Sequence, residues 1–82
     1  MYYTYILKSK IKYRYYIGHC AVLEERLKLH NNGNSKSTKA YIPWELVYSE
    51  EYETKSEAMK REYALKRIKN KSVLEKIINK LI

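Results

Sequence analysis

Residues 2–8 (YYTYILK) and 13–18 (YRYYIG) decide how this chain folds. Both segments are rich in tyrosine and isoleucine, and aromatic and β-branched residues favour strands. Residues 9–12 (SKIK) between them are short and polar enough for a hairpin turn. A symmetric turn would place Tyr5 directly opposite Tyr16. We therefore expect two phenols to share one face of an antiparallel strand pair.

A helix and a third strand are expected next. The helix covers residues 22–31, and Gly33 is well placed to end it. A polar loop then leads to a strand over residues 44–52. Alternation along this strand puts three side chains on one face, namely Trp44, Leu46 and Tyr48.

Two capping boxes predict the last two helices. Thr54 with Glu57 opens a helix over residues 55–69, and Ser72 with Glu75 opens one that ends near residue 81. The last helix has an apolar stripe that would suit either its own core or a second copy of the chain. The stripe consists of Val73, Leu74, Ile77, Ile78 and Leu81.

The predicted element order is β-β-α-β-α-α. This order indicates an α/β (α+β) fold with a small three-stranded antiparallel sheet flanked by helices. A chain of 82 residues has room for one hydrophobic core, so we expect one domain over residues 1–82. No signal pattern follows Met1, and no apolar stretch approaches the roughly 18 residues of a membrane helix. We expect a cytoplasmic protein that does not insert in membranes.

The charge and the acidic composition limit the chemistry. Seventeen basic side chains face nine acidic ones, a net charge of +8. Such a surface favours phosphate backbones, although a solvated lysine-rich face would explain the charge equally well. All nine acidic residues are glutamate, and there is no aspartate. Sites that hold two metal ions between clustered aspartates, and phosphate cradles rich in glycine, are therefore disfavoured.

Charged residues fall inside the apolar arcs of two predicted helices. Arg26 and His30, one turn apart, lie within the arc set by Val22, Leu23, Leu27 and Leu29. Glu62 lies within the arc set by Ala58, Met59, Tyr63 and Leu65. An unpaired buried charge is costly, so these residues would either form an Arg26–Glu62 ion pair, extend to the edge of the stripe, or line a polar cleft.

Five motifs in order resemble the GIY-YIG nuclease superfamily, in particular its small single-domain bacterial members. They are Thr4-Tyr5-Ile6, Tyr16-Ile17-Gly18, Leu23-x-x-Arg26-x-x-x-His30-Asn31-x-Gly33, residues 43–48 (PWELVY) and residues 54–66 with Glu62. The second motif matches literally, whereas Tyr3 stands where the first motif has glycine.

The resemblance implies a catalytic set of Tyr5, Tyr16, Arg26, His30 and Glu62. Glu62 would bind one Mg²⁺ or Mn²⁺, Arg26 would contact the scissile phosphate, and the tyrosines would prepare the attacking water, with Tyr5 favoured as the base. Asn70 is a candidate for the asparagine that members of the family often carry near the site. The expected activity is metal-dependent DNA endonuclease cleavage that is selective for structure rather than sequence. The alternative is a non-catalytic basic module that binds nucleic acid and retains the fold.

Overall fold

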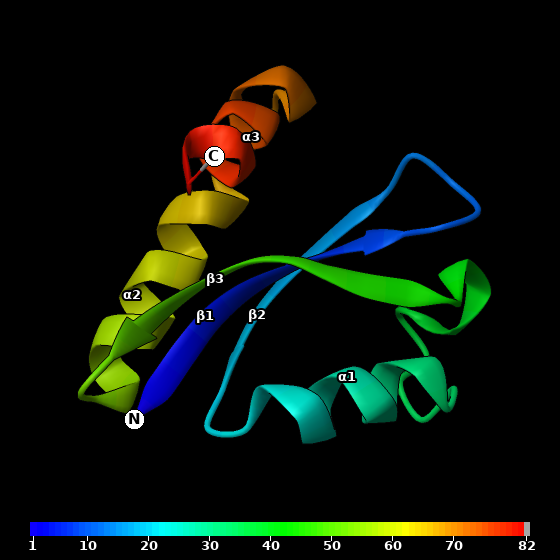
Figure 1. The fold of residues 1–82 in the computed structure, drawn as a ribbon, viewed down its shortest axis with the longest axis horizontal. Coiled ribbons are helices and arrows are strands. Elements are labelled where there is room, and N and C mark those ends of the chain that lie inside the picture. The colour runs from blue at the N-terminus through cyan, green and yellow to red at the C-terminus, as the bar shows by residue number, and fades with distance from the viewer. Residues whose placement is uncertain (82) are drawn as a thin grey trace.

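The computed structural model describes residues 1–81, which form a three-stranded sheet and three α-helices (Figure 1). The elements are β1 (Tyr2–Ser9), β2 (Tyr15–Cys20), α1 (Leu23–Asn31), β3 (Trp44–Tyr52), α2 (Lys55–Lys66) and α3 (Lys71–Ile78), with short 3₁₀ turns at Lys39–Tyr41 and Asn79–Leu81. The sheet is antiparallel with strand order β2-β1-β3. The predicted fold class and element order are confirmed.

The two faces of the sheet carry separate cores. Figure 1 shows α1 on one side of the strands and α2 with α3 on the other. The α1 side buries Tyr5, Leu7, Cys20 and Trp44, with Leu23 and Leu27 of α1 packed against them. The α2 and α3 side buries Ile6, Ile17, Leu65 and Leu74. Alternation along β1 therefore sends successive residues to opposite cores.

The hairpin register differs from the symmetric turn. Tyr5 pairs with Gly18, and Tyr16 pairs with Leu7, so the prediction of direct opposition is wrong. The connecting loop is longer than predicted because the Ser9 hydroxyl accepts the backbone N–H groups of residues 11 and 12 and holds a wider turn. A shift by two residues keeps each side chain on its face. Tyr5 and Tyr16 still share one face, with ring centroids 6.4 Å apart.

Strand β3 spans the predicted residues but has a bulge. Its pairing with β1 shifts between Ile6, which pairs with Tyr48, and Leu7, which pairs with Leu46. The extra residue, Val47, and Tyr48 both pack on the α2 and α3 side, whereas Trp44 packs on the α1 side. The expectation of Trp44, Leu46 and Tyr48 on one face is therefore wrong. A bulge reverses alternation, and neither glycine nor proline marks it in the sequence.

Helix α1 ends as predicted but is rotated from the predicted arc. Gly33 has a φ of +77°, and its N–H bonds to the carbonyl of His30, while the N–H of Asn34 bonds to that of Leu29. These are the two bonds of a Schellman end, which favours glycine at this position. Val22 and Leu29, which helped to set the predicted arc, are exposed. The sheet-facing stripe is Leu23, Leu27 and His30.

One of the two predicted capping boxes forms. Thr54 and Glu57 cap α2 reciprocally. The Ser72–Glu75 box is wrong, because Asn70 is the N-cap of α3 and accepts the N–H of Ser72. Glu75 instead accepts hydrogen bonds from two phenols near the hairpin, those of Tyr13 and Tyr15.

The apolar stripe of α3 packs on the protein's own core. Leu74 is buried, and Ile77 and Ile78 contact the same cluster, whereas Val73 is exposed. The side chain of Leu81 lies outside the described part of the chain. None of the helices within residues 1–81 is both long and apolar enough to cross a membrane.

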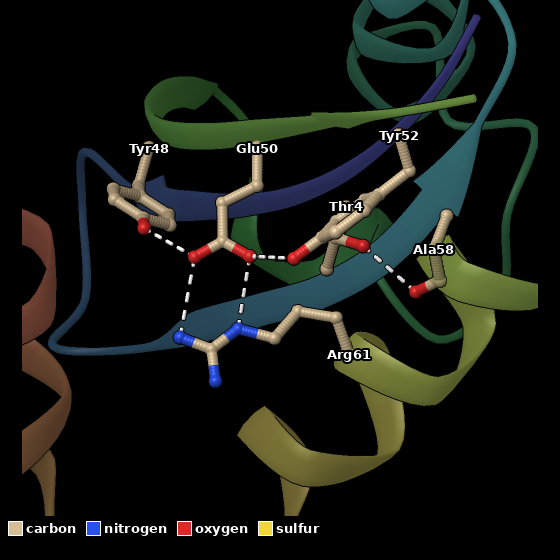
Figure 2. Close-up of polar contacts among 6 residues, drawn as sticks. All are labelled: Thr4, Tyr48, Glu50, Tyr52, Ala58 and Arg61. Atoms are coloured by element: carbon tan, nitrogen blue, oxygen red, sulfur yellow. Dashed lines mark hydrogen bonds and ion pairs between the residues drawn. The ribbon is translucent and has the colours of Figure 1, made fainter.

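A polar cluster ties α2 to β3 (Figure 2). Arg61 donates two hydrogen bonds to the Glu50 carboxylate, at 2.9 and 3.2 Å. The phenols of Tyr48 and Tyr52 donate to the same carboxylate. The buried Thr4 hydroxyl donates to the carbonyl of Ala58 at 2.7 Å. These contacts fix the helix that carries Glu62 against the sheet.

Candidate active site

The candidate residues gather around β2, which lies at an edge of the sheet. Side chains alternate along a strand, so Tyr16 and Gly18 face α1, while His19 between Gly18 and Cys20 faces α2. Tyr16 packs with the α1-side core, and His19 contacts Glu62 of α2. Residues from both helices therefore meet at one edge strand.

Gly18 allows a close approach between β2 and Tyr5. A Cβ atom at position 18 would stand 2.6 Å from the Tyr5 hydroxyl oxygen and 2.8 Å from Cζ. It would also stand 3.3 Å from a ring carbon of Tyr16. Only glycine fits here without movement of the tyrosines, which gives a physical reason for the glycine after Tyr16-Ile17.

Tyr5 is buried and contacts His30. Its hydroxyl lies 3.2 Å from His30 Nε2, and His30 Nδ1 lies 3.0 Å from the Thr38 hydroxyl. All three side chains are buried, with Thr38 fully so. Burial raises the pKa of Tyr5 well above its ordinary value. Burial also lowers the pKa of His30, and the nearby charge of Arg26 lowers it further. At neutral pH the pair is therefore a protonated phenol beside a neutral imidazole.

Arg26 is exposed beside this buried pair. It lines one surface depression together with Tyr16, Leu29, His30, Asn34 and Ser35. It also lines a second depression with Tyr2, His19, Cys20, Ala21 and Lys55. Arg26 therefore lines both hollows, which is the polar-cleft alternative among the three that the sequence left open.

Two side chains, His19 and Lys66, hold Glu62. Its carboxylate lies 2.5 Å from His19 Nδ1 and 2.7 Å from Lys66 Nζ, and the side chain is 12% exposed. Burial tends to raise the pKa of Glu62, but the hydrogen bonds from Lys66 and His19 outweigh it and hold the pKa below its usual range. Glu62 is thus a carboxylate at neutral pH. Its bonds are to His19 and Lys66, so the alternative of an Arg26–Glu62 ion pair is not realised.

The five predicted residues lie near one another. The ring centroids of Tyr16 and His30 lie 4.7 Å apart. Arg26 and Glu62 are close enough for their charges to act on the Tyr5 hydroxyl. Asn70 caps α3 and is not among the side chains that line either depression. Tyr3 donates to Glu51 from an ordinary strand conformation, so no glycine is required at that position.

Sequence reasoning missed three side chains: His19, Lys66 and Thr38. His19 follows Gly18, and strand alternation alone would have directed it toward α2. The spacing of Glu62 and Lys66 by four residues was a visible signal for an ion pair. Thr38 carries no local signal, because its contact with His30 depends on how the loop after α1 folds.

The donor set at Glu62 fits a hard divalent cation that keeps most of its water. Within residues 1–81 no three or more His, Cys, Asp or Glu side chains gather into a metal cluster. Mg²⁺ is commonly bound through one or two carboxylates, several waters and substrate phosphate rather than by an all-protein cage. An ionised, partly exposed carboxylate bonded to His19, which lines the second depression, is one such ligand.

Comparison with known proteins decides the family. The family model described as the GIY-YIG catalytic domain matches residues 1–77. The chain belongs to the GIY-YIG family. The match to the GIY-YIG family thus extends over nearly the whole length of the chain.

Relatives of this GIY-YIG domain are small proteins of similar length. A UPF0213 protein of Staphylococcus saprophyticus is 43% identical over 76 residues, which is 92% of each chain. A UPF0213 protein of Clostridium perfringens is 43% identical over 83 residues, covering all of this chain and 88% of the relative. The solution structure of a UPF0213 protein from Bacillus halodurans matches with a TM-score of 0.56 and 30% identity, covering 94% of this chain and 83% of that one.

Proposed function

We propose that this domain is an endonuclease that hydrolyses phosphodiester bonds in DNA with one divalent cation, Mg²⁺ or Mn²⁺. The observation that carries the proposal is the buried Tyr5–His30 contact directly beside exposed Arg26. Family membership supports nuclease chemistry. The basic surface supports a nucleic-acid partner.

Tyr5 would act as a proton relay. Its raised pKa means that the phenol does not ionise in advance, so it can accept a proton from water only while it gives up its own. His30 Nε2, at 3.2 Å, is the group placed to take that proton. The resulting hydroxide attacks phosphorus, and the bond to the leaving oxygen breaks. Tyr16 lines the depression beside Arg26 and would orient the water.

Arg26 would bind the scissile phosphate. A fixed guanidinium stabilises charge that develops on phosphoryl oxygens in the transition state. Lys55 lies along the second depression, so a strand crossing Arg26 would meet a second cation for a neighbouring phosphate. Glu62 would hold the metal ion, which would polarise the phosphate and stabilise the leaving oxygen.

The alternative is a basic binding module that retains the fold without activity. Phosphate binding needs exposed cations only, and these would position nucleic acid without a buried histidine and tyrosine pair. Such a pair, with a neutral imidazole beside a phenol, is the arrangement that general base catalysis requires. The geometry therefore favours catalysis.

Substrate choice would follow the shape of the DNA. Arg26 lines both depressions, and each depression is lined by only six residues. They would contact only nucleotides next to the scissile phosphate. Long sequence readout requires more base contacts than these hollows provide, so we expect selectivity for branched, flapped or single-stranded structure.

The test is cleavage of labelled single-stranded, duplex, flap and branched DNA in Mg²⁺, in Mn²⁺ and in a chelator, with binding measured in parallel. We expect metal-dependent cutting, and Arg26→Gln should lower the rate by about a hundredfold or more. The matched control is Arg67→Gln, which removes the same charge from an exposed residue at the end of α2. Binding without cutting by the wild-type protein would favour the alternative.

A further inference from the structure

Thr38 is a buried side chain with a defined place beside the proposed proton relay. It lies in the connection between α1 and β3, and its carbonyl accepts the indole N–H of Trp44 at 2.9 Å. Its backbone N–H bonds to the carbonyl of Ser35. These contacts hold the Thr38 hydroxyl 3.0 Å from His30 Nδ1. Within residues 1–81, Nδ1 has no other hydrogen bond.

The protons in this chain of contacts can be arranged in two ways. A carbonyl only accepts, and the Thr38 hydroxyl lies within hydrogen-bond distance of the Ser35 carbonyl, at 3.4 Å. If Thr38 donates to that carbonyl, His30 must donate from Nδ1 to the Thr38 oxygen. Its Nε2 then carries a lone pair, and Tyr5 donates to it. Every proton in this arrangement has an acceptor.

The reverse arrangement makes one hydrogen bond fewer within the protein. If His30 carries its proton on Nε2, it donates to the Tyr5 oxygen, and the Tyr5 proton must find another partner. Within residues 1–81, His30 is the only hydrogen-bond partner of the Tyr5 hydroxyl. The first arrangement makes three hydrogen bonds among Tyr5, His30, Thr38 and the Ser35 carbonyl, whereas the reverse makes two, so the first is favoured.

We propose that Thr38 is a positioning residue that fixes His30 in the Nδ1–H tautomer and directs its Nε2 lone pair at Tyr5. Its catalytic consequence rests on the proposed function, whereas the tautomer does not. In the opposite tautomer His30 would donate to Tyr5 and could not take its proton. Once His30 has accepted the proton, the Nδ1–H bond to Thr38 also helps to support the imidazolium.

The test combines a spectroscopic and a kinetic measurement. In protein with ¹⁵N-labelled histidine, the ring nitrogen shifts of wild-type His30 near neutral pH should show a protonated Nδ1 and an unprotonated Nε2. Thr38→Val removes the hydroxyl at nearly constant shape and should move the proton to Nε2 or start exchange between the tautomers. Thr38→Ser should restore the wild-type pattern. Ser37→Ala, in the same loop but exposed, is the control.

Cleavage kinetics provide the second measurement. Thr38→Val should lower kcat about 10- to 100-fold with little change in KM, because the hydroxyl acts through His30 rather than on the substrate. Thr38→Ser should stay within about threefold of wild type. Equal losses in the Val and Ser variants would contradict the proposal.

The two proposals can fail separately. A wild-type His30 with its proton on Nε2 overturns the tautomer assignment, and this measurement needs no variant to fold and no activity. A Thr38→Val protein that keeps the Nδ1–H pattern also overturns it. A protein with the expected tautomer that cuts no DNA would instead overturn the proposed function and leave the tautomer assignment standing.

Discussion

At the scale of single residues, the Tyr5 hydroxyl and the His30 imidazole are expected to act as one unit. If they share one proton path, removing either should abolish the same step. Tyr5→Phe and His30→Gln should each lower the single-turnover cleavage rate by about 100-fold or more. The double variant should be nearly as active as either single variant. Independent losses that multiply in the double variant would contradict the relay.

Substitution of Gly18 tests the close packing against the Tyr5–His30 pair. Gly18→Ala places a methyl group 2.6 Å from the Tyr5 hydroxyl oxygen, so the ring must move away from His30. We expect a loss of about 1–3 kcal/mol in the free energy of unfolding, measured by urea denaturation. In a Tyr5→Leu background the clashing atoms are absent, and the loss should fall below half. The same loss in both backgrounds would mean that the clash is not its cause.

Lys66 would compete with the proposed metal ion for Glu62. Its ammonium lies 2.7 Å from the carboxylate and its side chain is 48% exposed, so the ion pair is weak and solvent-screened. Lys66→Met should bind Mn²⁺ about two- to fivefold more tightly in calorimetry, since one competing charge is gone. Lys69→Met is the control for loss of an exposed charge nearby. Weaker binding in the Lys66 variant would contradict a metal site at Glu62.

At the scale of elements, Glu50 holds α2 on β3 (Figure 2). Burial tends to raise its pKa, but hydrogen bonds from Arg61, Tyr48 and Tyr52 outweigh it, so the pKa lies below the ordinary 4.5. The folded state thus binds the proton less readily than the unfolded chain. The stabilisation is fully present above pH 4.5 and is lost as pH falls through the lowered pKa.

Glu50→Gln should reveal this dependence. We expect a loss of about 1–3 kcal/mol in unfolding free energy at neutral pH, because three donors lose a charged acceptor. The gap to wild type should narrow as the pH falls below about 4.5, since the wild-type carboxylate then becomes protonated. Glu53→Gln, an exposed change at the end of β3, is the control. A gap that stays constant with pH would show that the carboxylate charge is not responsible.

Local sequence signals predicted the elements well and their contacts less well. The Thr54–Glu57 box and the glycine end of α1 formed because every group involved lies within six residues. The Ser72–Glu75 box does not form because Asn70 caps the helix instead, and because two phenols near the hairpin donate hydrogen bonds to Glu75. The bulge in β3 likewise depends on pairing with a distant strand.

The candidate site shows the same division. Helical spacing and the motif resemblance indicated Tyr5, Tyr16, Arg26, His30 and Glu62, and the structure brings them to one edge strand. The predicted orientation of α1 about its axis was less accurate. Val22 and Leu29 are apolar but exposed, whereas the pattern assumes that apolar residues are buried. The contacts of Thr38 in the loop and of His19 on the far face of β2 depend on the tertiary fold, so the local sequence did not predict them.

At the scale of the whole molecule, the excess of basic residues should set affinity rather than the chemical step. Each phosphate neutralised contributes about 0.7–0.9 to the slope of log affinity against log salt. Replacing Arg26 and Lys55 together with glutamine should therefore reduce that slope by about 1.5. Lys76→Gln with Lys80→Gln, away from the two depressions, should change it less. Equal changes in the two double variants would mean that DNA does not follow these hollows.

The central claim is that the edge of β2 is a phosphodiesterase site with Glu62 as its metal-binding carboxylate. The most direct test is the single-turnover cleavage rate of one labelled DNA in Mg²⁺ for wild type, Glu62→Gln and Glu57→Gln. Glu57 lies on the same helix, and glutamine still satisfies its capping box, so this control loses the same charge without harm to the fold. We predict at least a hundredfold loss for Glu62→Gln and less than a threefold loss for Glu57→Gln. Equal cleavage by all three proteins would contradict the claim.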